Sequence, residues 1–225
     1  MIGNMNRPNG GIAARLPGVT VPFLGVGLDG ATPADTAYPV LDVSWQYDPI
    51  SDFPVNPLNL LALANSGVAF LLLHANYFPA DLTTTPRALP DTTVGNITYI
   101  TLKPPRLPLL VPAAVLGVPP VLLDLVEPAL TVLVDAAYDY DAGPATPVPL
   151  QLQTRPERLQ QLPGKLTEAI HQGVRAFVED LRPGGPAVAH SRRPSHPPSA
   201  AQKPTTAKRS TAGTARHRTA SADAA

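Results

Sequence analysis

Two residues of this chain have the types and the order that acid–base catalysis of acyl transfer requires. Asp48 stands at the end of a predicted strand over residues 39–47, and His74 ends a predicted apolar helix over residues 58–73. In α/β-type serine hydrolases the acid precedes the histidine in the chain, and both lie on loops beyond strand ends. The acid fixes the imidazole tautomer, while the histidine accepts and returns the nucleophile's proton. Asp48 and His74 therefore predict an acid and a base, with Asp52 in the same loop as the alternative acid.

Both positions also fit ordinary structural roles. Asp48 and Asp52 each stand near a proline, Pro49 and Pro54 respectively, and aspartate commonly forms turns in such segments. His74 stands where the dipole of the preceding helix favours a histidine. Spacing alone leaves the structural and the catalytic interpretation open.

A serine nucleophile is the group that these 225 residues do not offer. None of the serines stands in a Gly-x-Ser-x-Gly sequence, which forms the sharp strand-to-helix turn of this enzyme class. Ser66 lies in an apolar helical segment, where its hydroxyl is expected to bond back to the preceding turn. The histidines show no metal-ligand spacing, and cysteine is absent. The sequence therefore predicts no nucleophile, no metal, no cofactor and no redox chemistry.

Three segments have the composition of strands, and one of them must position the acid Asp48 at its end. Residues 19–28 are rich in β-formers, with Pro22 expected at the start or the edge of the strand. Residues 39–47 form the second predicted strand, which ends before Asp48-Pro49. The third covers residues 96–103, where apolar residues alternate with threonine.

Helical segments alternate with these strands and continue beyond them. Asn56 is the expected cap of the helix over residues 58–73, with Pro57 at its first position. This apolar run is shorter than the roughly 20 residues that span a bilayer. Residues 107–126 are punctuated by proline and predict short helical turns, followed by a helix over residues 128–138. An amphipathic helix is predicted between Pro163 and Leu181.

The last 43 residues differ in composition from all that precede them. Residues 183–225 contain none of Leu, Ile, Phe, Tyr or Trp, so apolar burial cannot offset the chain entropy and we expect disorder. Seven basic residues stand there against one acidic residue, a net charge of +6, whereas the rest of the chain carries −6. That balance argues against nucleic-acid binding by the folded part. Only the tail is expected to bind polyanions, and weakly.

Several sequence strings, specific in order and spacing, resemble the PE-PPE domain family of mycobacteria. They are Ile2-Gly3-Asn4 with Arg7-Pro8-Asn9-Gly10-Gly11, Asp29-Gly30-Ala31-Thr32-Pro33 with Asp35-Thr36, Gln46-Tyr47-Asp48 with Asp52-Phe53-Pro54, Asn56-Pro57-Leu58-Asn59-Leu60-Leu61-Ala62 with Asn65, and His74 with Tyr77. The resemblance implies an α/β-hydrolase, cutinase-like fold with serine esterase or lipase activity. It also implies Asp48 as the triad acid, His74 as the base, and a nucleophile upstream of Ile2.

From these observations we expect an α/β protein with a partial α/β-hydrolase (cutinase-like) fold that lacks its N-terminal strands. Residues 1–150 are expected to form the C-terminal part of a PE-PPE domain, residues 151–182 a linker and amphipathic helix, and residues 183–225 a disordered basic tail.

The expected function is that of a truncated serine esterase, inactive alone, which acts on an ester or lipid substrate when the missing part is supplied. The alternative is a non-catalytic binding or scaffold protein of the cell envelope. No signal peptide follows Met1. Localisation is thus unknown from the residues, although the resemblance implies the cell envelope or secretion.

Overall fold

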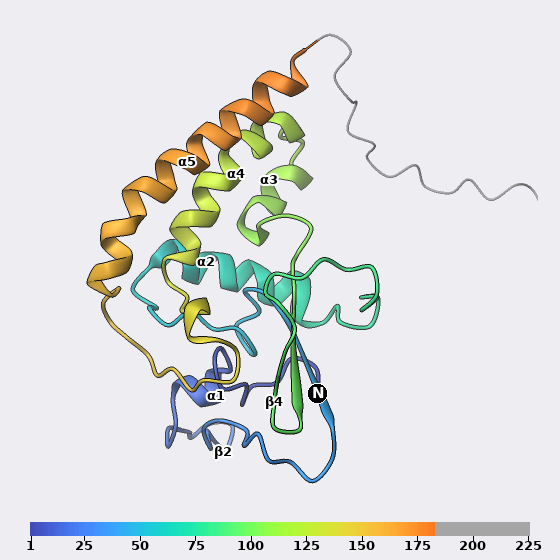
Figure 1. Cartoon of the computed structure of the whole chain (residues 1–225), viewed down its shortest axis with the longest axis vertical. Helices are drawn as coiled ribbons and strands as arrows, with labels where there is room; N and C mark the ends of the chain where they lie inside the picture. Colours follow the sequence, from blue (N-terminus) through green and yellow to red (C-terminus); the bar gives the residue numbers. More distant parts are fainter. Residues whose placement is uncertain (183–225) are drawn as a thin grey trace, which may run out of the picture. The chain divides into compact units, whose positions relative to one another are not determined.

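The computed structural model describes residues 1–182 and contains a mixed three-stranded sheet (Figure 1). Its strands are β3 (Val40–Trp45), β4 (Thr92–Val94) and β5 (Ile97–Leu102), in the order β3-β5-β4. β3 and β5 run parallel, with Val40 opposite Ile97 and Trp45 opposite Leu102, whereas β4 is antiparallel to β5. The strands expected over residues 39–47 and 96–103 are confirmed. The parallel pair connected through a helix confirms the α/β class.

The start of the chain lies along the other edge of β3. Ile2 forms a parallel bridge with Val43, whose amide donates to the Met1 carbonyl (2.9 Å) and whose carbonyl accepts from the Gly3 amide (3.0 Å). Residues 1–3 thus extend the sheet in the same direction as β3. This places Gly3 beside the middle of β3.

The two faces of the parallel pair differ in chemistry because side chains alternate along a strand. Val43 and Trp45 share one face with Ile100 and Leu102, and Tyr77 packs against this apolar cluster. The opposite face carries Asp42, Ser44 and Thr101, which are buried all the same. The polar face must therefore be hydrogen-bonded by other parts of the chain.

The helix that leads to His74 consists of α2 (Leu60–Ala69) and a wider π-helical turn, η1 (Phe70–His74). Its end agrees with the expectation, but its start does not. Asn59, not Asn56, is the cap, and its side chain accepts from the Ala62 amide (3.0 Å). Asn56 instead accepts from the Leu58 amide in the preceding turn, so the proline that follows it does not begin the helix.

The first expected strand is wrong as a single element. Two short strands, β1 (Thr20–Val21) and β2 (Val26–Gly27), form an antiparallel hairpin there. The residues between them form turns, and Gly25 has a φ of 61°. The segment therefore folds back on itself instead of crossing the sheet.

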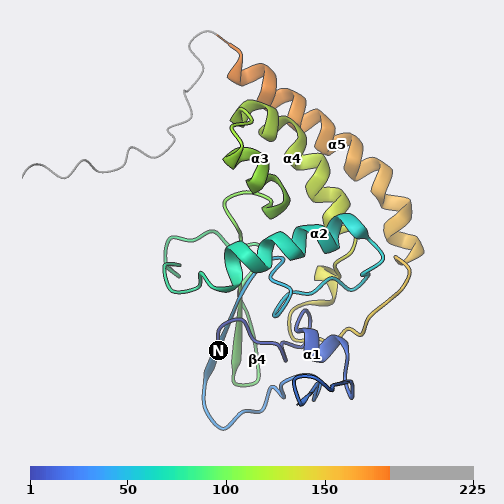
Figure 2. The same cartoon turned by 180° about the vertical axis from the view of Figure 1, so that it is seen from behind.

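The helices after β5 form a separate layer, seen above the sheet in Figure 1 and from behind in Figure 2. Short turns, η2 (Pro108–Leu110) and α3 (Val111–Val115), precede α4 (Pro120–Asp135). Pro128 does not begin a helix as expected, because α4 runs through it. α5 (Pro156–Asp180) packs along α4 and begins seven residues before the expected Pro163. The remaining elements are α1 (Ile12–Arg15) and η3 (Tyr140–Ala142).

The chain divides into two units, Met1–Ala187 and Val188–Ala225, and the described residues belong to the first. The expected disorder and polyanion binding of residues 183–225 lie outside the described residues. The expected domain limits at residues 150 and 182 stay predictions. Within residues 1–182, each helix is too short or too polar to cross a membrane.

Candidate active site

Asp48 and His74, which lie 26 positions apart in the chain, are in direct contact. His74 Nδ1 lies 2.9 Å from one carboxylate oxygen of Asp48 and 3.0 Å from the other. The Asp48 side chain is completely buried, whereas a third of the His74 side chain is exposed. A buried acid thus holds the inner nitrogen of an imidazole whose other side faces solvent.

Three further groups hold the Asp48 carboxylate in place. The hydroxyl of Tyr77 donates to Oδ2 at 2.5 Å, the hydroxyl of Ser51 donates to Oδ2 at 3.1 Å, and the Ile50 amide donates to Oδ1 at 3.0 Å. Burial, and then the nearby carboxylate, raises the pKa of the Tyr77 phenol far above its usual value, so Tyr77 remains a donor. These three donors fix the orientation of the Asp48 carboxylate toward His74.

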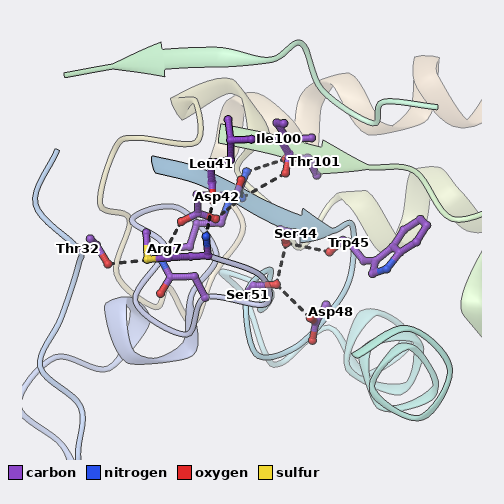
Figure 3. Close-up of polar contacts among 12 residues, drawn as sticks. Arg7, Thr32, Leu41, Asp42, Ser44, Trp45, Asp48, Ser51, Ile100 and Thr101 are labelled. Carbon is purple, nitrogen blue, oxygen red and sulfur yellow. Dashed lines mark hydrogen bonds and ion pairs between the residues drawn. The ribbon is translucent and has the colours of Figure 1, made fainter. Parts of the chain in front are cut away.

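The turn after β3 directs Asp48 toward the helix. Tyr47 has a φ of 72°, which among the described non-glycine residues occurs only here and which costs roughly 1–2 kcal/mol. Ser44 on β3 lies 2.8 Å, oxygen to oxygen, from Ser51, which in turn bonds to Asp48 (Figure 3). The polar face of β3 and the strained turn therefore fix the acid together.

A buried ion pair anchors the segment that lies next to the site. Arg7 donates to Asp42 Oδ1 at 2.8 Å and to Thr101 Oγ1 at 2.8 Å, and both ends of the pair are buried (Figure 3). Asn4 donates to the second oxygen of Asp42 at 2.7 Å. The polar motif that begins the chain thus serves the fold, because it satisfies the polar face of β3 and β5.

His74 faces this anchored segment across a small pocket. The pocket has a volume of about 230 Å³ and is lined by Ile2, Gly3, His74, Ala75, Tyr77 and Phe78. Gly3 has a φ of 58°, and a side-chain carbon added to it would lie 3.2 Å from His74 Cε1. Within residues 1–182 no group hydrogen-bonds to His74 Nε2. The imidazole therefore has space beside it and one nitrogen ready to exchange a proton.

Asp52, the alternative acid, lies elsewhere and does not contact His74. Its Oδ2 accepts from the Tyr47 amide at 2.8 Å and from the Tyr140 hydroxyl at 3.0 Å. Burial raises the pKa of Asp52 to about 6, although these two hydrogen bonds act against the shift. The structure thus brings Asp48, not Asp52, to the histidine.

Sequence reasoning missed the roles of the groups that support the pair. Tyr77 was named with His74 only as part of the family resemblance, and Ser51 carried no signal, because both meet Asp48 only through the fold of the turn and of residues 75–77. Gly3 offered one clue, since a glycine within a polar turn motif often marks a close approach of two segments. Ser66, rejected as a nucleophile, shares a hydrogen bond with the hydroxyl of buried Tyr138 (2.8 Å), not with the preceding turn.

A metal centre finds no support in the described part of the chain. Among residues 1–182, no three carboxylate or imidazole side chains gather as metal ligands would. Acid–base chemistry by Asp48 and His74 is what the arrangement can perform.

Comparison with known proteins places this pair in a family context. The PE-PPE domain matches residues 1–139. Over 160 residues, or 68% of this chain, the sequence is 45% identical to the Uncharacterized PPE family protein PPE42 of Mycobacterium tuberculosis. It is 40% identical to Esterase PE16 over 158 residues, again 68% of the chain, and 35% identical to SL1278 acyltransferase Chp1 over 142 residues, 57% of the chain, both of the same organism.

The matched segment is a small part of these relatives. The chain spans 26% of PPE42, 29% of Esterase PE16 and 33% of acyltransferase Chp1. No solved structure matches the chain. The domain match covers more than half of the 225 residues and includes both Asp48 and His74, so this chain belongs to the PE-PPE domain family.

Proposed function

We propose that this chain provides the acid and the base of a serine-dependent acyl-transfer centre that acts on an ester or lipid. The contact of 2.9 Å between His74 Nδ1 and the buried carboxylate of Asp48 is the observation that carries the proposal. Esterase and acyltransferase names among the relatives agree with this chemistry. Ester hydrolysis and acyl transfer differ only in whether water or another hydroxyl accepts the acyl group.

In this proposal Asp48 keeps the proton of His74 on Nδ1, so that Nε2 carries the free electron pair. Nε2 then takes the proton of a serine hydroxyl as that oxygen attacks the ester carbonyl, and gives it to the departing alcohol. The buried carboxylate stabilises the imidazolium that exists between the two steps. Tyr77 and Ser51 contribute by holding Asp48.

The nucleophile of this centre is proposed to come from outside these 225 residues. Ser44 and Ser51 bond to each other beneath Asp48, and Ser66 bonds to Tyr138, so none of the three lies free beside His74. The pocket between His74 and Gly3 is where a serine from an added segment would fit. The parallel order of residues 1–3, β3 and β5 supports a partial α/β-hydrolase, cutinase-like sheet that such a segment would extend.

A chimera tests the proposal. The part of Esterase PE16 that precedes its matched region is fused to Met1, and hydrolysis of p-nitrophenyl butyrate is measured for the chimera and for the 225-residue chain. We expect the chimera to be active, the chain alone to be inactive, and His74→Ala to reduce the chimera's rate at least 100-fold.

His171→Ala is the matched control, because His171 is exposed on α5, far along the chain from the site. Its rate should equal that of the parent chimera. An active chimera that is indifferent to His74→Ala refutes the assignment of the base. A folded chimera without activity would instead favour the binding or scaffold alternative.

A further inference from the structure

A second and larger cavity opens beside the candidate site, on the other side of residues 72–78. It has a volume of about 760 Å³, within the range of ligand pockets in proteins. Leu72, Leu73 and Asn76 line it, whereas His74, Ala75, Tyr77 and Phe78 line the small pocket beside Gly3. The segment that carries His74 therefore separates two cavities, and only the smaller one includes the imidazole.

The wall of this larger cavity is mainly apolar. Trp45 forms one side at the end of β3, where Figure 3 shows its indole directed away from Arg7 and Asp42. Leu72 and Leu73 form another side, and Pro79 and Ala80 follow from the segment after η1. Such a surface favours hydrocarbon over water.

One charged side chain lines this cavity among the described residues, and it is a cation. Lys103 follows β5 directly, and within residues 1–182 it forms no ion pair with a carboxylate. The other polar lining groups are the neutral side chains Asn76, Thr84 and Thr85. An occupant that satisfies both features has a long apolar part and a single negative charge.

We propose that this cavity binds a free fatty acid, with its hydrocarbon chain along Trp45, Leu72 and Ala80 and its carboxylate at the ammonium group of Lys103. Charge complementarity selects an anion over a neutral lipid, and the mainly apolar wall selects a long chain over a short one. Binding requires neither Asp48 nor His74. The site therefore goes beyond the proposed acyl-transfer centre and does not depend on it.

Lys103 also borders a neighbouring cavity of about 710 Å³ between β5 and the layer of α4 and α5. That cavity is lined by further cations and by carboxylates, among them Lys165, Glu127 and Asp135. Its mixed charges do not select a single anion with a hydrocarbon chain. Lys165 therefore provides a matched control for Lys103, as a lysine that lines the polar cavity but not the apolar one.

The chain reports on this site by itself, because Trp45 is its single tryptophan. Sodium dodecanoate is titrated into the full chain below its micellar concentration, and tryptophan fluorescence is recorded. We expect a saturable change with dodecanoate and none with acetate. Dodecanol and dodecyltrimethylammonium should bind about tenfold more weakly or worse, since they lack the charge-assisted contact with Lys103.

Variants locate the site. Lys103→Gln should weaken dodecanoate binding about tenfold, Lys165→Gln should leave it unchanged, and Ala80→Phe should abolish it by filling the cavity, with circular dichroism confirming the fold of each. His74→Ala should bind like the parent chain, so an inactive chimera does not affect this result. Equal affinity of the parent, Lys103→Gln and Ala80→Phe, or equal affinity for dodecanoate and dodecanol, overturns the proposal.

Discussion

Asp48 and Asp52 stand four residues apart in one loop, both are buried, and their surroundings differ in kind. Asp48 contacts hydroxyl groups and an imidazole that is partly exposed, whereas Asp52 contacts a backbone amide and the phenol of Tyr140 in the interior. Tyr47 precedes both: its positive φ turns the chain directly before Asp48, and its amide donates to Asp52. A carboxylate beside a group that can exchange protons with solvent suits catalysis, while an enclosed carboxylate serves the fold.

The largest expected difference between the two carboxylates is catalytic. In the active chimera, Asp48→Asn should lower kcat by about 10⁴-fold, because an amide in that place favours the wrong tautomer of His74. Asp52→Asn should stay within a few-fold of the parent, since Asp52 does not touch His74. Kinetics of p-nitrophenyl butyrate hydrolysis measure both, and a larger loss for Asp52→Asn would reverse the assignment of the acid.

Two glycines extend the comparison, because Gly10 lies against Ser51 and Asp52, whereas Gly3 lies against His74, the partner of Asp48. A Cβ on Gly10 would lie 2.6 Å from the Ser51 carbonyl oxygen and 2.9 Å from Asp52 Cα, at a φ of 130°. Gly10→Ala should therefore reduce the free energy of unfolding by roughly 3 kcal/mol, measured by urea denaturation.

Gly3→Ala tests the surroundings of His74 in the same way. Its Cβ would meet the imidazole, which can shift, so we expect a loss of about 1–2 kcal/mol in stability from the positive φ together with a clear loss of chimera activity. If Gly3→Ala destabilised the chain more than Gly10→Ala did, the interior side would not be the more rigid one.

The pH dependence of stability should report the interior carboxylates. Burial raises the pKa of Asp52 to about 6, and burial likewise raises that of Asp135, which accepts a hydrogen bond from Tyr47. The folded state binds these protons more tightly than the unfolded state, so their stabilising effect is complete below pH 4 and is lost as the pH rises through 6. For Asp52 the change is about 3 kcal/mol.

Urea denaturation between pH 4 and 7.5 tests this sign. The decrease should be smaller in Asp52→Asn and smaller still in the double variant that adds Asp135→Asn. A parent chain whose stability rises steadily over this range would contradict the enclosed state of Asp52.

The smallest expected effects concern the two phenols that donate to these carboxylates, Tyr77 to Asp48 and Tyr140 to Asp52. Tyr77→Phe removes the donor at 2.5 Å from Asp48 and should reduce chimera activity several-fold, because the acid loses one of its positioning contacts. Tyr140→Phe removes the donor to Asp52 and should cost about 1 kcal/mol in stability while activity stays the same. Matched measurements of rate and unfolding show whether the two effects separate in this way.

The sequence indicated the acid and the base more readily than the structure that joins them. A strand ending before Asp48-Pro49 and an apolar helix ending at His74 predicted two positions that the structure brings into contact, although their catalytic roles stay predictions. Composition could not show that the chain turns at Tyr47 so that its amide donates to Asp52, because a positive φ in a tyrosine has no sequence signal.

The errors in the elements arise from tertiary contacts. Asn56 and Asn59 are both capping residues, and which one begins α2 depends on the contact of Asn59 with the Leu133 carbonyl, 74 positions away. Pro128 ends many helices, but within α4 the apolar packing against α2 and α5 outweighs its missing hydrogen bond. Tertiary contacts decided these boundaries.

The π-helical turn at Phe70–His74 sets the rotation of the histidine about the helix axis. Such a turn holds one residue more than α-helical geometry allows, and one residue corresponds to about 100° of rotation. Five residues of a π-helical turn rotate the chain about as far as four residues of an α-helix, so loss of a single codon between Phe70 and His74 would restore a regular helix and leave the imidazole facing Asp48. The same loss within the regular helix α2 has no extra residue to absorb it and would rotate His74 by about 100°, whereas the largely exposed Leu71 in the π-helical turn is the residue that the helix can lose.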